Sequence, residues 1–351
     1  MRFSEIPGNE SVKKALVNMA DSGRVAHAML FYENDGCGAL ALALAYAQYL
    51  NCTCRHDGDS CGECPSCRKI SRMLHSDVHY VFPTNAGTKC SMAAKDITSD
   101  VYIKEWNGLV SLNPYFLESE LIDALGLESK SWDINVLQAR KIIEALSLAP
   151  VEGKYKTVIC YLPEKMNVEA ANKLLKIIEE PPENTVFLFV THNPDKVLQT
   201  IFSRCQSSRV MPLSREEVEK ALVETFGKDP GEASCQASIC MGSIGAALHG
   251  LSDSADRTLF LDMFADMVNA CLKSDLIAAL NTGEKMAETG SREKQKALCT
   301  FFSDCLRNIY MLQNGMDKIA FIPVPSGTSS KNALSSAARH SAAEYFLYLT
   351  G

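Results

Sequence analysis

The sequence lacks the features that direct a protein into or across a membrane. Among its 351 residues, no apolar run approaches the about 18 consecutive residues of a membrane-spanning helix. Residues 1–7 have no apolar core of the kind that a signal peptide requires, and no low-complexity tract or internal repeat is evident. We therefore expect a cytoplasmic protein with no membrane partner.

Excess positive charge is also missing. The chain has 35 Lys and Arg against 42 Asp and Glu, a net charge of −7. Affinity for phosphate comes from clustered Lys and Arg, so this balance argues against a protein that binds nucleic acid alone through a broad basic surface. It leaves room for a subunit that touches nucleic acid only within an assembly. The length allows two or three domains.

Cysteine, in contrast, is abundant, with 14 residues. Nine are scattered in apolar or helical contexts and are interpreted as small buried side chains. Cys61, Cys64 and Cys67 are spaced C-x₂-C-x₂-C, which lets short turns direct several sulfurs at one point. Four thiolates form a closed tetrahedral zinc site with no open position. We predict structural zinc with Cys52 as the fourth ligand and Cys54 in reserve; an iron–sulfur cluster or a redox dithiol are weaker interpretations.

The apolar pattern predicts an α/β domain followed by helices. Strand-like runs fall at 28–32, 78–82, 156–162 and 185–191, and segments of helical spacing separate them. This alternation predicts right-handed βαβ units and a doubly wound parallel sheet. Residues 83–132 mix polar residues with short amphipathic pieces, and we expect them to form a surface insertion. From Pro212 onward the strands stop and helical spacing prevails.

The loop after the first strand resembles a phosphate-binding loop whose chemistry has been lost. Such loops read G-x-x-x-x-G-K-[ST]: backbone amides and the Lys bind phosphate, and the hydroxyl binds magnesium. Residues 33–40 read E-N-D-G-C-G-A-L, so Gly36 and Gly38 remain. Ala39 stands at the Lys position and cannot supply a cation. Leu40 stands at the hydroxyl position and cannot bind magnesium.

Three further patterns accompany this loop. They are the cysteine cluster behind the loop's helix, the run N-V-E-A-A-N-K-L-L-K-I-I-E-E-P-P at residues 167–182, and the triplet Ser203-Arg204-Cys205. Together they resemble bacterial DNA polymerase III clamp-loader subunits over about residues 1–250. The resemblance implies an AAA+ base domain at 1–211, containing the zinc module at 52–67 and the insertion at about 83–132. A small helical lid at 212–252 and an all-α collar at 253–351 would follow.

The resemblance also implies that this subunit is no motor. Motor subunits end their second nucleotide strand in Asp-Glu, where this chain has Tyr161 and Leu162. They often carry a lid Arg at the position that matches Gly245. Metal and cations stabilise the transition state of phosphoryl transfer, so we expect no intrinsic ATPase and no use of ATP or magnesium in cis. The pattern is similar to the non-catalytic stator of the loader.

Arg204 is the one catalytic position that the chain retains. In the family this residue is an arginine finger that reaches across a subunit interface to the neighbour's ATP. The implied partners are the gamma/tau motor subunits and the delta subunit, with the sliding clamp contacted indirectly and primed DNA bound within the assembly. Residues 179–182 are expected to end a helix and shape the interface. Residues 191–193 follow the strand where AAA+ proteins carry a polar nucleotide sensor, and a turn-forming role is the alternative. The alternatives are an ATP-hydrolysing gamma/tau-type motor and a zinc-binding adaptor unrelated to replication.

Overall fold

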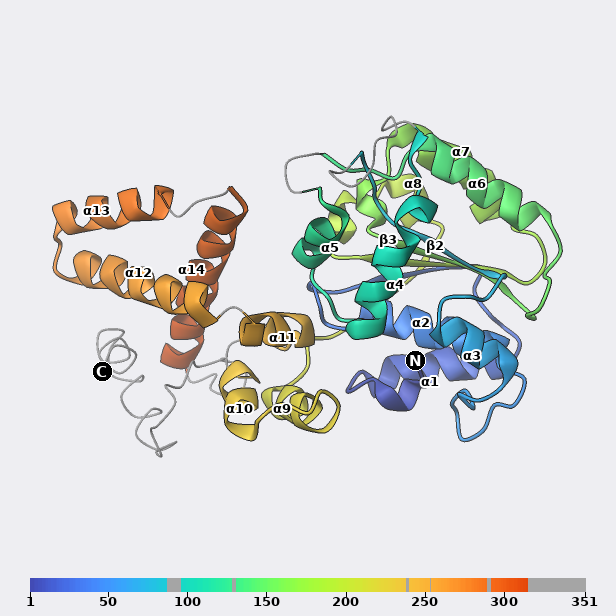
Figure 1. Ribbon diagram of the computed structural model, residues 1–351, viewed down its shortest axis with the longest axis horizontal. Coiled ribbons are helices and arrows are strands. Elements are labelled where there is room, and N and C mark those ends of the chain that lie inside the picture. The colour runs from blue at the N-terminus through green and yellow to red at the C-terminus, as the bar shows by residue number, and fades with distance from the viewer. Residues whose placement is uncertain (87–95, 128–130, 238–239, 253, 289–291, 315–351) are drawn as a thin grey trace. The chain divides into compact units, whose positions relative to one another are not determined.

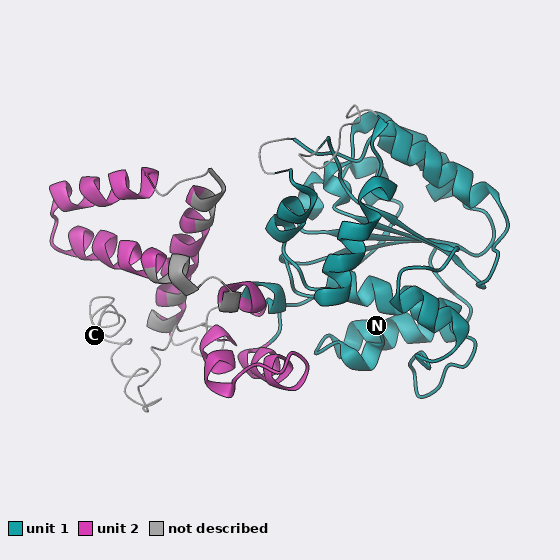
Figure 2. Ribbon diagram, in the orientation of Figure 1, with its two compact units in different colours: residues 1–213, 243–246 teal, residues 214–242, 247–351 magenta. Residues whose placement is uncertain are grey.

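The computed structural model describes residues 1–86, 96–127, 131–237, 240–252, 254–288 and 292–314 (Figure 1). The chain forms two compact units (Figure 2). Unit 1 contains residues 1–213 and 243–246, and unit 2 contains residues 214–242 and 247–351. Every site discussed below lies within unit 1.

Unit 1 is built on a five-stranded parallel sheet with the order β2-β3-β4-β1-β5. The strands are β1 (Ala28–Tyr32), β2 (Val78–Val81), β3 (Lys156–Tyr161), β4 (Thr185–Thr191) and β5 (Gln206–Arg209). The predicted apolar runs supply four of them, and β3 and β4 are buried along their whole length. The edge strand β5 was missed because its residues, Q-S-S-R, are polar and mostly exposed.

Helices cover both faces of this sheet (Figure 1). One face carries α1 (Glu10–Asp21), α2 (Ala39–Asn51) and α3 (Pro65–Ser71), and α2 is buried throughout. The other carries α6 (Val136–Ser147), α7 (Val168–Glu179) and α8 (Gln199–Phe202), whose apolar side chains form one core with β1, β3 and β4. The predicted doubly wound parallel sheet is therefore confirmed.

The insertion is not the surface excursion that its mixed composition suggested. It contains the 3₁₀ turn η3 (Ser99–Tyr102) and the helices α4 (Ile103–Leu112) and α5 (Glu118–Leu125). Trp106 of α4 is fully buried and stacks on Phe82 with ring centroids 4.4 Å apart. Its ring also meets the edges of Phe116 and Tyr161, each at 5.5 Å. These aromatic contacts make the insertion part of the core of unit 1.

Unit 2 is helical in the residues that the structure describes. Its helices are α9 (Arg215–Glu224), α10 (Pro230–Ala237), α11 (Ile244–Ser252, entered from unit 1), α12 (Ser254–Leu272), α13 (Leu276–Ala287) and α14 (Arg292–Gln313). Ser214 and Glu217 form a capping box at the start of α9. The lid at 212–252 and the collar at 253–351 stay predictions, and residues 315–351 of the latter lie outside the described residues. None of the described helices is long and apolar enough to cross a membrane.

Short 3₁₀ turns complete unit 1 and lie next to several of the predicted site residues. They are η1 (Phe3–Glu5), η4 (Pro163–Lys165) and η5 (Pro194–Lys196). Of these, η4 begins two residues after the end of β3, and η5 begins three residues after the end of β4. These are the carboxyl ends of central strands, the edge at which open parallel sheets place their ligand sites.

Candidate functional site

The loop between β1 and α2 keeps the backbone of a phosphate-binding loop. Gly36 and Gly38 have φ values of 76° and 109°, which side chains rarely adopt. A Cβ atom on Gly36 would lie 2.7 Å from Ser243 Oγ, and one on Gly38 would lie 2.8 Å from a ring carbon of Tyr115. Both positions therefore require glycine for their conformation and for the atoms packed against them.

The anion position of this loop is filled by the chain's own carboxylate. Glu33 is only 7% exposed, and its Oε2 accepts a hydrogen bond from Ala39 N at 2.6 Å. That amide is the first of α2, and such N-terminal amides are the groups that bind phosphate oxygens. The side chains of Ala39 and Leu40 are buried and apolar, so they add neither charge nor a metal ligand.

A buried histidine lies among carboxylates beside the loop. His192, at the end of β4, places Nε2 3.7 Å from Glu33 and Nδ1 3.4 Å from Asp35 and 3.9 Å from Glu118. Burial lowers the pKa of His192, but Glu118, Glu33 and Asp35 together raise it to about 10. Its single positive charge faces three carboxylates, so the cluster offers a triphosphate little net attraction.

Glu118 belongs to the insertion and connects it to this cluster. Its backbone N donates to Asp35 Oδ2 at 2.9 Å, and its carboxylate pairs with Lys165 Nζ at 3.0 Å. Burial opposes ionisation, yet hydrogen bonding to His192 and the charge of Lys165 lower the pKa of Glu118 to about 2. Lys165 is thus paired with a carboxylate rather than placed for phosphate.

Tyr161 and Leu162, at the carboxyl end of β3, are packing groups. Tyr161 is 1% exposed, and its ring meets His192 edge-on at 5.4 Å. Burial raises the pKa of Tyr161 well above its ordinary value, so its oxygen is no anionic ligand. Leu162 is fully buried with φ of 56°, a left-handed conformation that costs a branched side chain about 1–2 kcal/mol. Neither residue can hold a metal ion or orient water.

The segment 243–246 also packs against the loop between β1 and α2. Gly245 N donates to Gly36 O at 3.1 Å, and Ser243 Oγ donates to Asp35 O at 2.8 Å. A Cβ atom on Gly245 would lie 2.0 Å from Tyr115 O, so this packing excludes any side chain. The structure thus brings the predicted loop residues, Tyr161 and Gly245 into one region. It adds groups that sequence reasoning did not assign: Glu33, Asp35, Tyr115, Glu118 and His192.

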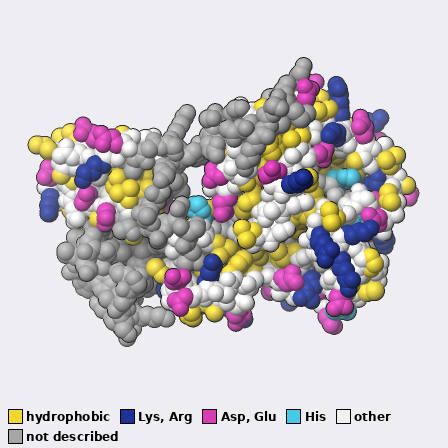
Figure 3. Space-filling model, viewed as in Figure 1, with side chains coloured by type: hydrophobic (Ala, Val, Ile, Leu, Met, Phe, Trp, Pro, Cys, Tyr) yellow, Lys and Arg dark blue, Asp and Glu magenta, His cyan; other side chains and the backbone are white. Residues whose placement is uncertain are grey.

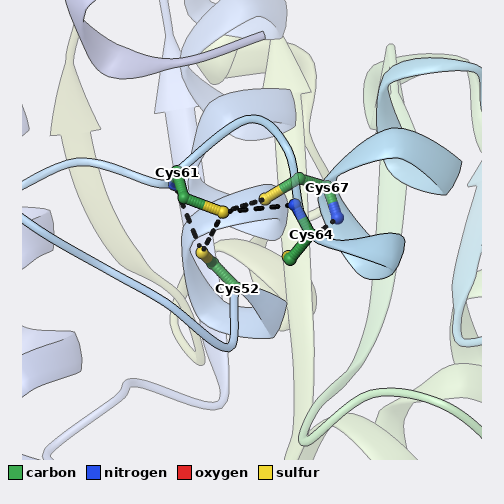
Figure 4. A group of neighbouring side chains, drawn as sticks. All are labelled: Cys52, Cys61, Cys64 and Cys67. Carbon is green, nitrogen blue, oxygen red and sulfur yellow. Dashed lines mark hydrogen bonds between the residues drawn. The ribbon is translucent and has the colours of Figure 1, made fainter.

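The cysteine cluster is a second candidate site (Figure 4). Cys52 ends α2, Cys64 caps α3 and Cys67 lies in the first turn of α3. The sulfurs of Cys52, Cys61, Cys64 and Cys67 all lie within 4.8 Å of one another, whereas Cys54 is exposed and outside the group. The structure therefore favours the predicted first choice of fourth ligand over the reserve.

The geometry of these sulfurs suits a tetrahedral metal ion. The Sγ atoms of Cys52 and Cys61 are 3.6 Å apart, and those of Cys61 and Cys67 are 3.9 Å apart. Zn–S bonds of about 2.3 Å in a tetrahedron place sulfurs about 3.8 Å apart. The backbone amides of Cys61, Cys64 and Cys67 donate to the sulfurs of Cys52, Cys61 and Cys64, respectively, at 3.3–3.4 Å, which stabilises thiolates. The arrangement is compatible with structural zinc.

Arg204 lies apart from both clusters, just after α8. Its Nε donates to Glu179 Oε1 at 2.5 Å, its Nη1 donates to Thr200 O at 2.6 Å, and its Nη2 pairs with Glu179. The side chain is 31% exposed. The next residue, Cys205, is partly buried and packs against the core. Arg204 therefore lies at the surface beside a residue that anchors the turn to the interior. Among the described residues, none of the hydrogen bonds or ion pairs of Arg204 involves His192 or the carboxylates around it.

Comparison with known proteins adds a family context. The family model described as "DNA polymerase III, delta subunit" matches residues 8–214. DNA polymerase III subunit delta' of Bacillus subtilis is 29% identical over 213 residues, covering 61% of this chain and 50% of that protein. DNA polymerase III subunit gamma/tau of Mycobacterium bovis is 31% identical over 202 residues, covering 58% of this chain and 27% of that protein.

A DNA polymerase III gamma subunit-related protein from Thermotoga maritima is 15% identical, with 97% of each chain covered and a TM-score of 0.39. The chain spans half or less of the length of the curated relatives named above.

Proposed function

The chain belongs to the DNA polymerase III delta-subunit family of clamp-loader proteins, and from this premise we propose that it is a delta-prime-type stator. In this role it does not hydrolyse ATP itself. It supplies Arg204 in trans to the ATP of a neighbouring motor subunit and supports loading of the sliding clamp onto primed DNA.

The observation that carries this proposal is the carboxylate inside the loop. Glu33 accepts the Ala39 amide that a phosphate would need, and the surrounding Asp35 and Glu118 carboxylates repel further negative charge. Phosphoryl transfer needs metal and cations around the transferred group. The loop offers the apolar Ala39 and Leu40 in their place, which supports a subunit without ATP or magnesium chemistry of its own.

Arg204 supplies the chemistry that the loop lacks. Its guanidinium is permanently charged and has five N–H donors, which suit the oxygens of a γ-phosphate. Such a finger raises the rate of hydrolysis by roughly 10³–10⁵. Its partial exposure leaves it accessible to a neighbouring subunit.

The cysteine cluster would contribute folding energy rather than catalysis. We propose that Cys52, Cys61, Cys64 and Cys67 hold a structural zinc ion. Four thiolates leave no coordination position for water or substrate. The module would then fix the loop between α2 and α3 and stabilise the base domain.

The assembly is part of the same proposal. Residues 212–252 would form the lid, and residues 253–351 the collar that binds the gamma/tau motor subunits. The delta subunit would be a further partner, with the sliding clamp contacted indirectly. On the face in Figure 3, Lys and Arg of unit 1 form separate groups among Asp and Glu, so DNA contact is assigned to the assembly rather than to this chain alone.

The likeness to gamma/tau subunits makes a motor of the same complex the second candidate. The purified chain separates the two. A stator shows no magnesium-dependent ATP hydrolysis, with or without primed DNA, whereas turnover that is lost on mutating the loop would establish the motor.

Reconstitution tests the trans role and the remaining alternative. The chain should co-purify with gamma/tau and delta subunits, and Arg204→Ala should abolish hydrolysis at the adjacent motor site without releasing the chain. Arg209→Ala, an exposed arginine of β5, is the matched control. Failure to associate with any loader subunit would instead favour an adaptor outside replication.

A further inference from the structure

We propose that Glu179 is the positioning residue that holds Arg204 in the orientation in which it meets the neighbour's nucleotide. The inference builds on the trans role of Arg204 proposed above. It starts from the contacts of the guanidinium: Glu179 binds Nε and Nη2, while Nη1 donates to Thr200 O and lies 3.4 Å from Ser203 Oγ.

These contacts fix the plane of the guanidinium from two sides. The carboxylate holds the edge formed by Nε and Nη2, and the backbone carbonyl of α8 holds Nη1. Arginine has five N–H groups, so these four contacts leave a further Nη2 hydrogen for a phosphate oxygen. The finger is thus ordered while retaining a donor for its target.

Glu179 itself stands on a rigid element. It is the last residue of α7, whose Ala171, Leu174 and Ile178 are buried in the core of unit 1. Arg204 instead follows the four-residue helix α8, which alone would fix a long side chain poorly. The carboxylate at the end of the packed helix therefore supplies the rigidity that the turn around Arg204 lacks.

The energetic scales favour a role in positioning over a role in folding. The two side chains are 31% and 45% exposed, and exposed ion pairs of this kind contribute little to stability. An arginine that is already ordered loses little further side-chain entropy when it engages phosphate. A misplacement of about 1 Å can cost about 10²-fold in rate. Loss of Glu179 should therefore impair catalysis in trans more than it impairs stability.

The test compares variants of this chain in the reconstituted complex, with saturating ATP and primed DNA. Glu179→Ala should lower kcat at the adjacent motor site by about tenfold while KM for ATP changes little, as expected when only the transition state loses a contact. Glu179→Gln keeps an acceptor oxygen in place and should restore most of the rate. Glu169→Ala, an exposed carboxylate in the first turn of α7, is the control and should match wild type.

A double variant asks whether Glu179 acts through Arg204. Glu179→Ala should cause no further loss when combined with Arg204→Ala, because the two residues form one unit. An unchanged or raised kcat in Glu179→Ala, with Arg204→Ala inactive, would overturn the positioning role alone. Full activity of Arg204→Ala would overturn the trans role itself. Thermal unfolding of each variant checks that the chain remains folded.

Discussion

The phosphate loop and the Arg204 edge of unit 1 treat charged groups in opposite ways. At the loop, the side chains of Glu33 and His192 are buried, at 3% and 6% exposure, and the histidine charge is balanced by carboxylates inside the fold. At the edge, Arg204 is bound by a carboxylate that is itself 45% exposed. Buried partners that satisfy one another leave no position for a ligand, whereas a half-exposed partner lets an arginine contact another subunit. The difference predicts which changes alter stability and which alter function.

The largest effect on stability is expected at the cysteine cluster, to which we assign a structural role and no catalytic one. Replacing Cys61 and Cys64 together by Ser should lower zinc content from about one ion per chain to none and cost at least several kcal/mol, because structural zinc contributes folding energy directly. Metal analysis and thermal unfolding measure both. Cys54→Ser should retain the ion, and full zinc content in the double variant would refute the assignment.

The next largest effect is expected inside the loop. Glu33→Ala removes the cap of Ala39 N and a carboxylate beside His192, and should lower the free energy of unfolding by about 3 kcal/mol. Denaturant unfolding measures the loss, with Glu180→Ala as control. The variant should still not bind ATP, because Ala39 and Leu40 remain. Titration with labelled ATP checks this, and measurable binding would show that Glu33 alone closes the loop.

The pH dependence of stability tests the charge of His192 beside the loop. The pKa of His192 is raised to about 10 in the folded chain, so its stabilising charge is complete below its ordinary pKa of 6.5 and is lost as pH rises through the folded value. Between pH 7 and pH 9 the wild type should lose about 2 kcal/mol that His192→Gln does not lose. The exposed His56→Gln is the control. Parallel pH profiles for wild type and His192→Gln would contradict the charged cluster.

The smallest effect on stability is expected at the finger. Arg204→Ala removes a half-exposed ion pair and should change the free energy of unfolding by less than about 1 kcal/mol. Calorimetry of the purified chain measures it beside Glu33→Ala. A loss as large as that of the loop variant would erase the distinction between the two regions.

Much of unit 1 could be predicted from sequence because its signals are local. Continuous apolar runs predict the buried strands, and C-x₂-C-x₂-C spacing predicts the cysteine ligands, because both depend on near neighbours in the chain. The strand β5 could not be predicted from the apolar pattern, because an edge strand needs no apolar residues.

The filling of the loop could not be predicted in the same way. Glu33 is visible as a substitution, but its bond to Ala39 N depends on the loop's conformation. Tyr115 and Glu118 come from an insertion without a periodic pattern, and only the fold brings them to Gly38 and Asp35. The contact between Glu179 and Arg204, 25 positions apart, likewise arises from the packing of α7 beside α8.

We propose above that the loop of this chain supports no ATP hydrolysis, whereas Arg204 contributes to hydrolysis at the neighbouring motor subunit. The most direct test of this proposal is single-turnover ATP hydrolysis at the adjacent motor site, in complexes assembled with wild-type or Arg204→Ala chain and primed DNA. We expect Arg204→Ala to lower the rate at that site by about 10³-fold or more, with the complex intact and the isolated chain inactive. Equal rates in the two complexes, or hydrolysis by the isolated chain, would contradict it.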